Sequence, residues 1–268
     1  MTSYKNILTG TVPLHNSWLI SLNQINKENI IIFDFTDDTN IKQIIIQKKI
    51  HYILPLSEKD YLLIKNYINN SVIHNIKILY PDIETFNILH NKLLFTQFML
   101  ENFKEQIPSV YYLDNKYVSE SEIEYPIISK PIYSTNGIGM KIYHNEDDFF
   151  KCKDKMIVQK FIDHLYEYSA YLLCIDGKII NWKIIKSEYK KYTIKTGTFP
   201  KNYQNVEKDE LQIQIFEPII VKLKYTGGMC IDFKYNTTTK KLDIFEINPR
   251  FGGSAFSNNF IYELLCIP

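Results

Sequence analysis

The N-terminal third of the chain alternates short apolar runs with amphipathic segments. Strand-like runs lie at residues 6–9, 29–35, 51–56 and 76–80, and helical spacing of apolar residues lies around residues 16–26, 39–49 and 58–69. Ser57 stands three residues before Asp60, a spacing typical of a capped helix start. Because strands that alternate with helices favour parallel pairing, we expect a small parallel α/β domain at residues 1–88.

Two pairs of strand-like segments later in the chain predict antiparallel hairpins. Residues 168–175 and 178–185 flank Asp176-Gly177, a dipeptide typical of two-residue turns because both positions tolerate positive φ. Residues 229–235 are followed by a polar turn at 236–241 and a further strand-like run.

Two further helices are expected, one before the first hairpin and one between the two hairpins. One opens at Asn91, and the other is an amphipathic helix over residues 205–224 that packs behind the final sheet.

Composition fits a globular enzyme. The chain has 268 residues, 45% of them hydrophobic, and its 31 Lys and Arg against 30 Asp and Glu give a formal net charge of +1. Near-neutrality gives no indication of a nucleic-acid or membrane partner, and no apolar stretch is long enough to cross a bilayer. The N-terminus lacks a signal-peptide apolar region, so the cytoplasm is the expected location. No paired metal spacing links the cysteines, which we expect to be free thiols: Cys152, Cys174, Cys230 and Cys266.

Arg250 is the only arginine in a chain whose other basic residues are all lysines. A guanidinium offers paired planar donors to phosphate or carboxylate oxygens, which an ammonium cannot reproduce. We therefore favour a functional role for Arg250 over a place in an exposed ion pair.

Apolar and polar side chains alternate in the segment that contains Arg250. A strand here would place Glu246, Asn248 and Arg250 on one face and Phe245 on the other. The predicted hairpin could also bring Asp232 beside Glu246 and Asn248. These oxygen ligands suit Mg²⁺ bound through phosphate oxygens, with Mn²⁺ as an alternative. An acidic hairpin facing water is the other reading, which repulsion between neighbouring carboxylates disfavours.

This segment resembles the metal-binding end of the ATP-grasp ligases, in the branch of carbamoyl-phosphate synthetase and D-alanine–D-alanine ligase. The resemblance covers residues from about 90 to 254, with five motifs in the family's order. The motifs are Lys92 at a helix start, Lys130-Pro131 in a strand, the loop Ser134-Thr135-Asn136-Gly137-Ile138-Gly139, the strand 156–162 followed by Glu167, and Asp232 with the run 246–254. The implied fold is α/β (α+β), an ATP-grasp fold with a central or lid subdomain at residues 89–158 and a metal-binding C-terminal subdomain at residues 159–268.

The resemblance implies that ATP is bound by residues along these motifs. A small-residue loop can turn backbone N–H groups toward phosphate oxygens, and lysines add positive charge against a triphosphate. Lys130 lies in an apolar strand, where a lone lysine without a partner is rare, whereas Lys92 fits an ordinary amphipathic helix equally well. The implied contacts are Lys92, Lys130, Ser134, Thr135, Gly137 and Gly139 with phosphates, Gln159, Lys160, Phe161 and Ile162 with adenine, and Glu167 with ribose.

Lysines gather after the turn at Asp176-Gly177. Relatives place a basic residue near the γ-phosphate at the end of this hairpin, and Lys183 or Lys186 is the candidate. For the remaining lysines up to Gly197, a solvated loop is favoured over a nucleic-acid patch because the net charge is near neutral.

The resemblance implies an ATP-dependent carboxylate–amine ligase. In such enzymes Mg·ATP phosphorylates a carboxylate to an acylphosphate, which an amine attacks to give an amide, ADP and phosphate. Asp232, Glu246 and Asn248 would hold the metal, and Arg250 would steady the transferring phosphoryl group. The expected partners are a small-molecule or peptide carboxylate and an amine, and a homo-oligomer is one assembly considered. A kinase of the same fold and a non-catalytic ATP-binding regulator stay open as alternatives.

Overall fold

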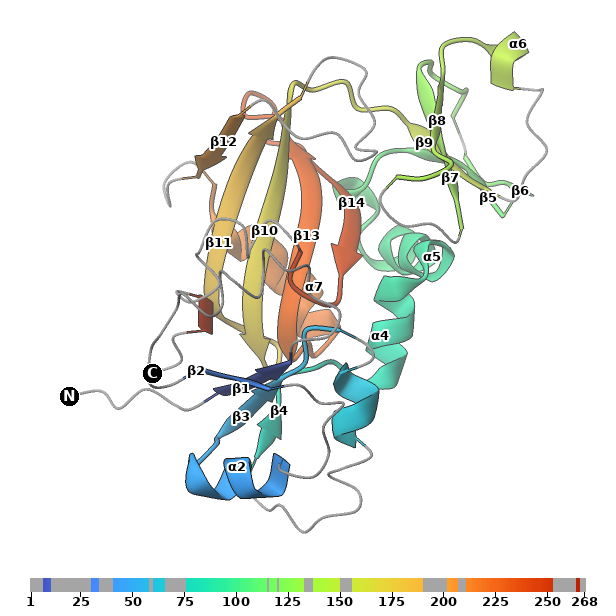
Figure 1. Ribbon diagram of the computed structural model, residues 1–268. Helices are drawn as coiled ribbons and strands as arrows, with labels where there is room; N and C mark the ends of the chain where they lie inside the picture. Colours follow the sequence, from blue (N-terminus) through green and yellow to red (C-terminus); the bar gives the residue numbers. More distant parts are fainter. Residues whose placement is uncertain are drawn as a thin grey trace.

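The computed structural model contains three separate sheets among the residues that it describes (Figure 1). The described residues are 7–10, 30–33, 41–57, 60–65, 76–114, 116–119, 121–132, 137–149, 156–189, 202–206, 211–252 and 264–265. No helix in these ranges is long and apolar enough to span a bilayer.

The N-terminal sheet is parallel, as the alternating pattern predicts. Its order is β2-β1-β3-β4, formed by β1 (Ile7–Gly10), β2 (Ile30–Phe33), β3 (Tyr52–Leu54) and β4 (Lys77–Ile78). The predicted helix around 39–49 is α2 (Ile41–Gln47), residues 60–65 are also helical, and the predicted helix at 16–26 lies outside the described residues.

The helix start at Ser57 is confirmed. The Asp60 amide donates to Ser57 Oγ at 3.1 Å, and the Leu56 amide donates to Asp60 Oδ2 at 3.1 Å. The Ser57 side chain thus accepts from the Asp60 amide, and the Asp60 side chain accepts from the amide just before Ser57, in a reciprocal pattern like that of a capping box.

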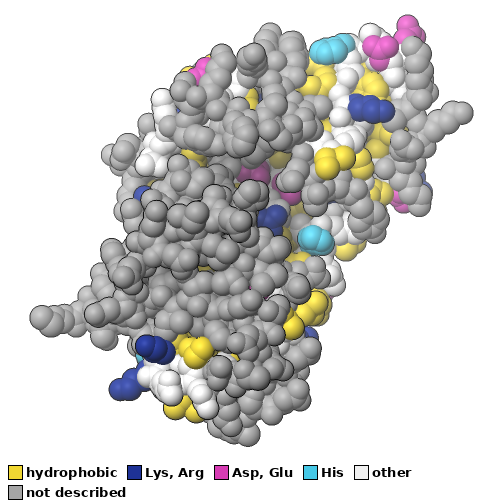
Figure 2. All heavy atoms as spheres, viewed as in Figure 1, with side chains coloured by type: hydrophobic (Ala, Val, Ile, Leu, Met, Phe, Trp, Pro, Cys, Tyr) yellow, Lys and Arg dark blue, Asp and Glu magenta, His cyan; other side chains and the backbone are white. Residues whose placement is uncertain are grey.

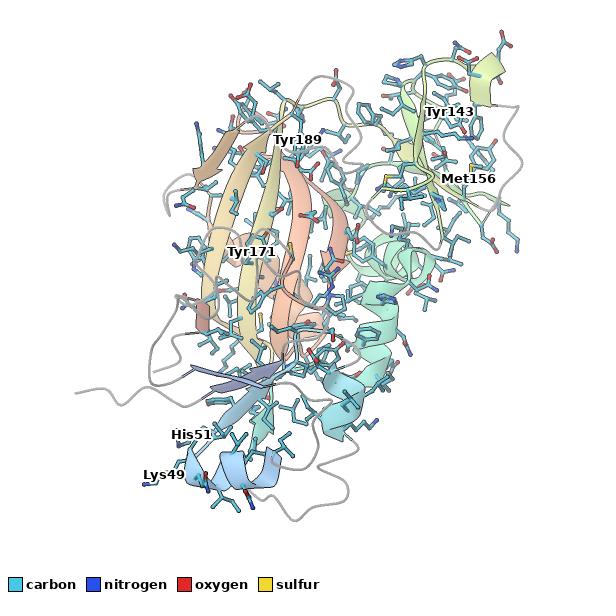
Figure 3. The ribbon with its side chains drawn as sticks, viewed as in Figure 1. Lys49, His51, Tyr143, Met156, Tyr171 and Tyr189 are labelled. Carbon is cyan, nitrogen blue, oxygen red and sulfur yellow. The ribbon has the colours of Figure 1, made fainter. Side chains whose placement is uncertain are left out.

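The central sheet carries the lysine and glutamine of the predicted nucleotide motifs. Its order is β6-β5-β9-β7-β8, formed by β5 (Val110–Leu113), β6 (Lys116–Tyr117), β7 (Ile127–Pro131), β8 (Lys141–Tyr143) and β9 (Met156–Lys160). A cluster of buried side chains that includes Ile127, Tyr143 and Met156 covers one face beside the short helix α6 (Glu146–Phe149) (Figure 3). The face that carries Lys130 is the opposite one.

The C-terminal sheet is antiparallel and contains both predicted hairpins. Its order is β12-β11-β10-β13-β14, formed by β10 (Tyr166–Ile175), β11 (Lys178–Glu188), β12 (Asn202–Asn205), β13 (Gly227–Tyr235) and β14 (Leu242–Asn248). Asp176 and Gly177 both have positive φ, 50° and 75°, which confirms the tight turn between β10 and β11.

Two helices connect the N-terminal and central sheets. Helix α4 (Ile83–His90) begins after Asp82, whose Oδ1 accepts from the Thr85 amide at 2.8 Å. Helix α5 (Lys92–Asn102) begins after Asn91, as predicted, and is followed by a 3₁₀ turn (Lys104–Gln106).

The predicted helix over residues 205–224 is wrong in extent. Residues up to Asn205 belong to the edge strand β12, and the helical part consists of a 3₁₀ turn (Ile213–Phe216) and α7 (Glu217–Lys222). Pro218, which has no N–H to donate, lies in the first turn of α7 and therefore fixes where the helix starts.

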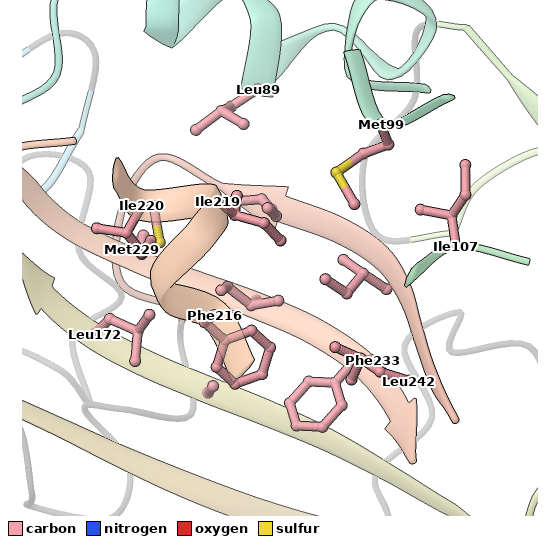
Figure 4. Close-up of a cluster of buried hydrophobic side chains, with 14 of the residues drawn as sticks. Leu89, Met99, Ile107, Leu172, Phe216, Ile219, Ile220, Met229, Phe233 and Leu242 are labelled. Atoms are coloured by element: carbon pink, nitrogen blue, oxygen red, sulfur yellow. The ribbon is translucent and has the colours of Figure 1, made fainter. Parts of the chain in front are cut away.

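The two faces of the C-terminal sheet bury different clusters. The helix face carries Tyr168, Leu172, Met229 and Phe233, which pack with Phe216 and with Ile219 and Ile220 of α7 (Figure 4). This confirms that the helix packs behind the sheet. The opposite face, called the site face below, carries Tyr171, Ile185 and Cys230, which pack with Leu54, Leu56 and Leu79 from the N-terminal sheet and the residues next to it.

Close approach of the N-terminal segment around Leu79 to the C-terminal sheet requires a glycine in β13. A Cβ on Gly227, whose φ is +132°, would lie 2.9 Å from the Leu79 carbonyl oxygen. Only a residue without a side chain allows the N-terminal sheet to lie this close to β13.

Candidate nucleotide and metal site

The hairpin of β13 and β14 brings the predicted metal ligands together. Asp232 is directly opposite Glu246, and Cys230 is directly opposite Asn248. Residues opposite each other, or two apart on a strand, share a face, so Asp232, Glu246 and Asn248 all lie on the site face. No cluster of three or more His, Cys, Asp or Glu side chains suited to a metal occurs in the described part of the chain. The predicted donors on this face are two carboxylates and one amide, a set that fits Mg²⁺ when phosphate oxygens and water complete its shell.

Asp232 is held by its neighbours on the site face. Ser169 Oγ donates to Asp232 Oδ1 at 2.5 Å, and Cys230 Sγ lies 3.8 Å from the same oxygen. Ser169 is directly opposite Asp232 across β10 and β13, so the register itself fixes this contact. One carboxylate oxygen is thus engaged within the sheet.

A bulge in β14 changes the direction of one predicted side chain. Asp232 pairs with Glu246, and the next residue of β13, Phe233, pairs with Ile244. Phe245 is therefore an extra residue in β14 that has no residue opposite it. The Phe245 ring lies 5.4 Å from Lys130 Nζ and 5.9 Å from Lys234 Nζ. The expectation that Phe245 faces away from Glu246 is wrong, because the bulge turns its ring toward the lysines of the site.

Lys130 reaches the site from the central sheet. Its side chain is buried, with 8% of the residue exposed. Burial lowers the pKa of Lys130 to about 8, the charges of Glu246 and Glu167 raise it, and the charge of Lys92 lowers it. Four residues that the sequence assigns to one site are therefore electrostatic neighbours in the structure.

Lys92 occupies the first turn of α5. The Asn91 side chain accepts from the Leu93 and Leu94 amides, at 2.9 and 3.2 Å, and leaves the helix N-terminus close to Lys92. Lys92 therefore adds a positive charge at the positive end of a helix, near the buried Lys130. The same arrangement favours a bound anion.

In segment 159–162, the side chains of Gln159 and Lys160 lie on opposite faces of the central sheet. Gln159 is buried and shares the Lys130 face, because Gln159 pairs with Ile128 two residues from Lys130. Lys160 points to the opposite face, where it forms an ion pair with Glu124. Of the predicted base contacts, Lys160 can therefore take part only through its backbone.

Backbone bonds fix this segment in place. The Lys160 amide donates to the Ser109 carbonyl at 2.8 Å, and the Phe161 amide donates to the Pro126 carbonyl at 3.0 Å. The Ile162 carbonyl accepts from Lys234 Nζ at 2.6 Å.

Register distinguishes the two lysine candidates of the second hairpin. Lys183 is opposite Tyr171, which is opposite Cys230, so Lys183 shares the site face with Asn248 (Figure 3 shows Tyr171 on this sheet). Lys186 is opposite Tyr168 on the helix face, and its Nζ lies 4.2 Å from the Tyr166 ring centroid. The structure therefore brings Lys183, and not Lys186, to the face of the predicted metal ligands.

The structure describes Arg250 and part of the predicted phosphate loop, from Gly137 to Gly139. Arg250 is exposed just beyond β14, and its Nη1 donates to the Phe251 carbonyl at 3.1 Å. Gly137 and Gly139 form a turn with φ of 71° and 79°, whereas Ser134 and Thr135 lie outside the described residues. Figure 2 shows acidic and basic side chains beside each other where the C-terminal and central sheets face each other.

Residues missed by the sequence prediction are Ser169, Phe245 as a site residue, and Lys234. Lys234 is two residues after Asp232, a spacing that places it on the same face of a strand. This alternation of side chains along the strand indicates Lys234 from the sequence. Its hydrogen bond to Ile162, by contrast, can be seen only in the structure.

Comparison with known proteins agrees with this geometry. The sequence model of the ATP-grasp domain family matches residues 89–254, which is most of the chain. The chain therefore belongs to this family. The fold class is that of the ATP-grasp proteins.

Two curated relatives and one solved structure illustrate the similarity. The carbamoyl phosphate synthase large chain of Methanobrevibacter smithii is 24% identical over 212 residues, covering 69% of this chain and 19% of the relative. A D-alanine–D-alanine ligase of Sulfurovum sp. is 25% identical over 185 residues, covering 65% of this chain and 51% of the relative. A crystal structure of a Bacillus anthracis D-alanine–D-alanine ligase complexed with ATP superposes with a TM-score of 0.54 at 15% identity, covering 98% of this chain and 95% of that one. This chain thus spans about a fifth to a half of the curated relatives' lengths, and the structural likeness speaks for the fold alone.

Proposed function

We propose that the protein is an ATP-dependent ligase that joins a carboxylate to an amine and releases ADP and phosphate. Support comes from the family, from relatives named as a ligase and a synthase, and from the residues that meet between the two sheets. The central observation is that Lys130 of the central sheet is an electrostatic neighbour of Glu246, which pairs with Asp232 on the C-terminal sheet.

Each part of the site has an assigned task. Asp232, Glu246 and Asn248 would hold one or more Mg²⁺ ions, which neutralise charge on the phosphates when bound. Lys130 and Lys92 would face the triphosphate, because the two cations are electrostatic neighbours and both carry positive charge that phosphate oxygens can meet.

The base would lie against segment 159–162. The amides of Lys160 and Phe161 are engaged in the fold, so a donor from this segment would be the Ile162 amide, while the buried Gln159 amide group offers an acceptor. Glu167, on the site face of β10, would accept from the ribose hydroxyls.

Phosphoryl transfer would take place toward the Lys183 and Arg250 end of the site face. In the proposed reaction a substrate carboxylate oxygen takes the γ-phosphoryl group, and an amine then displaces phosphate from the acylphosphate. Lys183 and Arg250 would stabilise charge on the phosphoryl oxygens as it is transferred. The three sheets favour a division into three parts near residues 1–88, 89–158 and 159–268, but α4 crosses the first of these boundaries and β9 crosses the second.

The test is product analysis with purified protein, Mg·ATP and pooled carboxylic acids and amines. A ligase gives an amide, ADP and free phosphate in equal amounts, and ADP release requires both substrates for completion of the cycle. Glu246→Gln is the matched control, because it removes one metal ligand and keeps the volume.

Other outcomes identify the alternatives. A stable phosphorylated product without free phosphate would show a kinase, for which ATP-grasp geometry is equally suitable. Nucleotide binding without ADP release from any pool would favour a regulator and would contradict the ligase proposal.

A further inference from the structure

Lys234 connects the metal-binding hairpin to the segment assigned to the base. Its Nζ donates to the Ile162 carbonyl oxygen at 2.6 Å. The same ammonium lies 5.5 Å from the Phe161 ring centroid and 5.9 Å from that of Phe245. One side chain from β13 thus touches the connection between β9 and β10 and the bulged residue of β14.

The position of Lys234 relative to the metal ligands follows from the strand. Lys234 is two residues beyond Asp232 and lies on the same face. Ile162 is the last residue of the segment assigned to adenine. The hydrogen bond therefore spans the two halves of the proposed site, with Asp232 at one end and the base-reading backbone at the other.

A lysine at this place is not explained by packing alone. Lys234 is only partly exposed and lies against two aromatic rings, a setting that an apolar side chain of the same length would fill without loss of hydration. What the ammonium adds is a charge-assisted bond to a backbone carbonyl across two elements far apart in sequence.

We propose that Lys234 is a positioning residue for the nucleotide base: it holds the Phe161–Ile162 backbone at a fixed distance from the metal carboxylates of the hairpin. The inference rests on the proposed ATP site and adds to it a residue that acts on the base and not on the phosphates. Binding of a complete nucleotide should depend on Lys234, whereas binding of a triphosphate that lacks base and sugar should not.

The experiment compares two ligands on matched variants. Affinities of the non-hydrolysable nucleotide AMP-PNP with Mg²⁺ are measured by calorimetry, and those of Mg-tripolyphosphate by competition against AMP-PNP. The variants are Lys234→Met, Lys234→Arg and, as a control, Lys222→Met at an exposed position of α7. Thermal unfolding of each variant checks that it is folded, and Lys234→Gln replaces the Met variant if that variant fails to fold.

The expected result is a split between the ligands. Lys234→Met should weaken AMP-PNP about tenfold, as for loss of a charge-assisted hydrogen bond, and should change the tripolyphosphate affinity less than about twofold. Lys234→Arg should restore most of the AMP-PNP affinity because a guanidinium can also donate to the Ile162 carbonyl. Lys222→Met should match the wild type for both ligands.

Three results would overturn the inference. They are unchanged AMP-PNP affinity in Lys234→Met, equal losses for both ligands, which would show a general effect on the hairpin, and a tripolyphosphate that does not compete in the wild type. Absence of AMP-PNP binding by the wild type would instead contradict the proposed function itself.

Discussion

Replacement of Lys130 by methionine should stabilise the free protein while it weakens nucleotide binding. Lys130 is buried, and burial lowers its pKa from the ordinary value of 10.5 to about 8. Each unit of pKa corresponds to about 1.4 kcal/mol, so keeping this lysine charged in the fold costs roughly 3 kcal/mol at pH 7. Methionine has similar length and no charge to desolvate.

The pH dependence gives this prediction its sign. The folded pKa lies below the unfolded pKa, so the unfolded chain binds more protons between pH 8 and 10.5 and the wild type gains stability as pH rises through that range. The advantage of Lys130→Met should therefore be about 3 kcal/mol at pH 7 and roughly 1.4 kcal/mol at pH 9.5. Urea unfolding at both pH values, without nucleotide, measures the difference.

Nucleotide binding supplies the second half of the test. A bound triphosphate favours the charged lysine, so binding to the wild type near pH 8.5 should take up a proton, seen by calorimetry in buffers of different ionisation enthalpy. Lys130→Met should lose this uptake and bind AMP-PNP at least about tenfold more weakly. If Lys130→Met is less stable than the wild type at pH 7 and equally so at pH 9.5, or binds AMP-PNP normally, the reasoning is refuted.

Three further predictions concern turnover once a substrate is known. Glu246→Gln should still bind nucleotide but lose activity, since one metal carboxylate is gone, and undiminished rates in an ADP-release assay would break its assignment. Arg250→Lys should lose on the order of a hundredfold in turnover, as for removal of a preorganised donor, and a near-wild-type rate would remove its proposed role. Lys183→Met should reduce kcat strongly while Lys186→Met leaves it unchanged, because only Lys183 shares the face of the metal ligands; equal effects of the two substitutions on kcat would contradict the register argument.

Local signals in the sequence were sufficient for the hairpins. Alternation of polar and apolar residues gives β13 and β14, and Asp176-Gly177 gives the turn between β10 and β11 because few residue pairs tolerate two positive φ values. Once these strands are known, the shared face of Asp232, Glu246 and Asn248 follows from the period of two along a strand.

Features that depend on register were not predictable from the sequence. The bulge at Phe245 adds one residue to β14 without a local signal, and it reverses the expected direction of that ring. The choice between Lys183 and Lys186 likewise depends on which of them is opposite Tyr171. That pairing between β10 and β11 is set by the register of the strands and has no local signal in the sequence. The helix ending at Lys222 is shorter than predicted because Pro218 sets its first turn, and the four residues before the helix form a 3₁₀ turn whose apolar spacing resembles that of an α-helix.

The most direct test of the account is the Mg²⁺ dependence of nucleotide affinity. Calorimetry with AMP-PNP would be run on the wild type and on the Asp232→Asn, Glu246→Gln double variant, each with Mg²⁺ and with EDTA. If the hairpin holds the metal, Mg²⁺ should strengthen binding in the wild type and have no effect in the double variant. No binding by the wild type, or the same Mg²⁺ dependence in both proteins, would contradict the central claim.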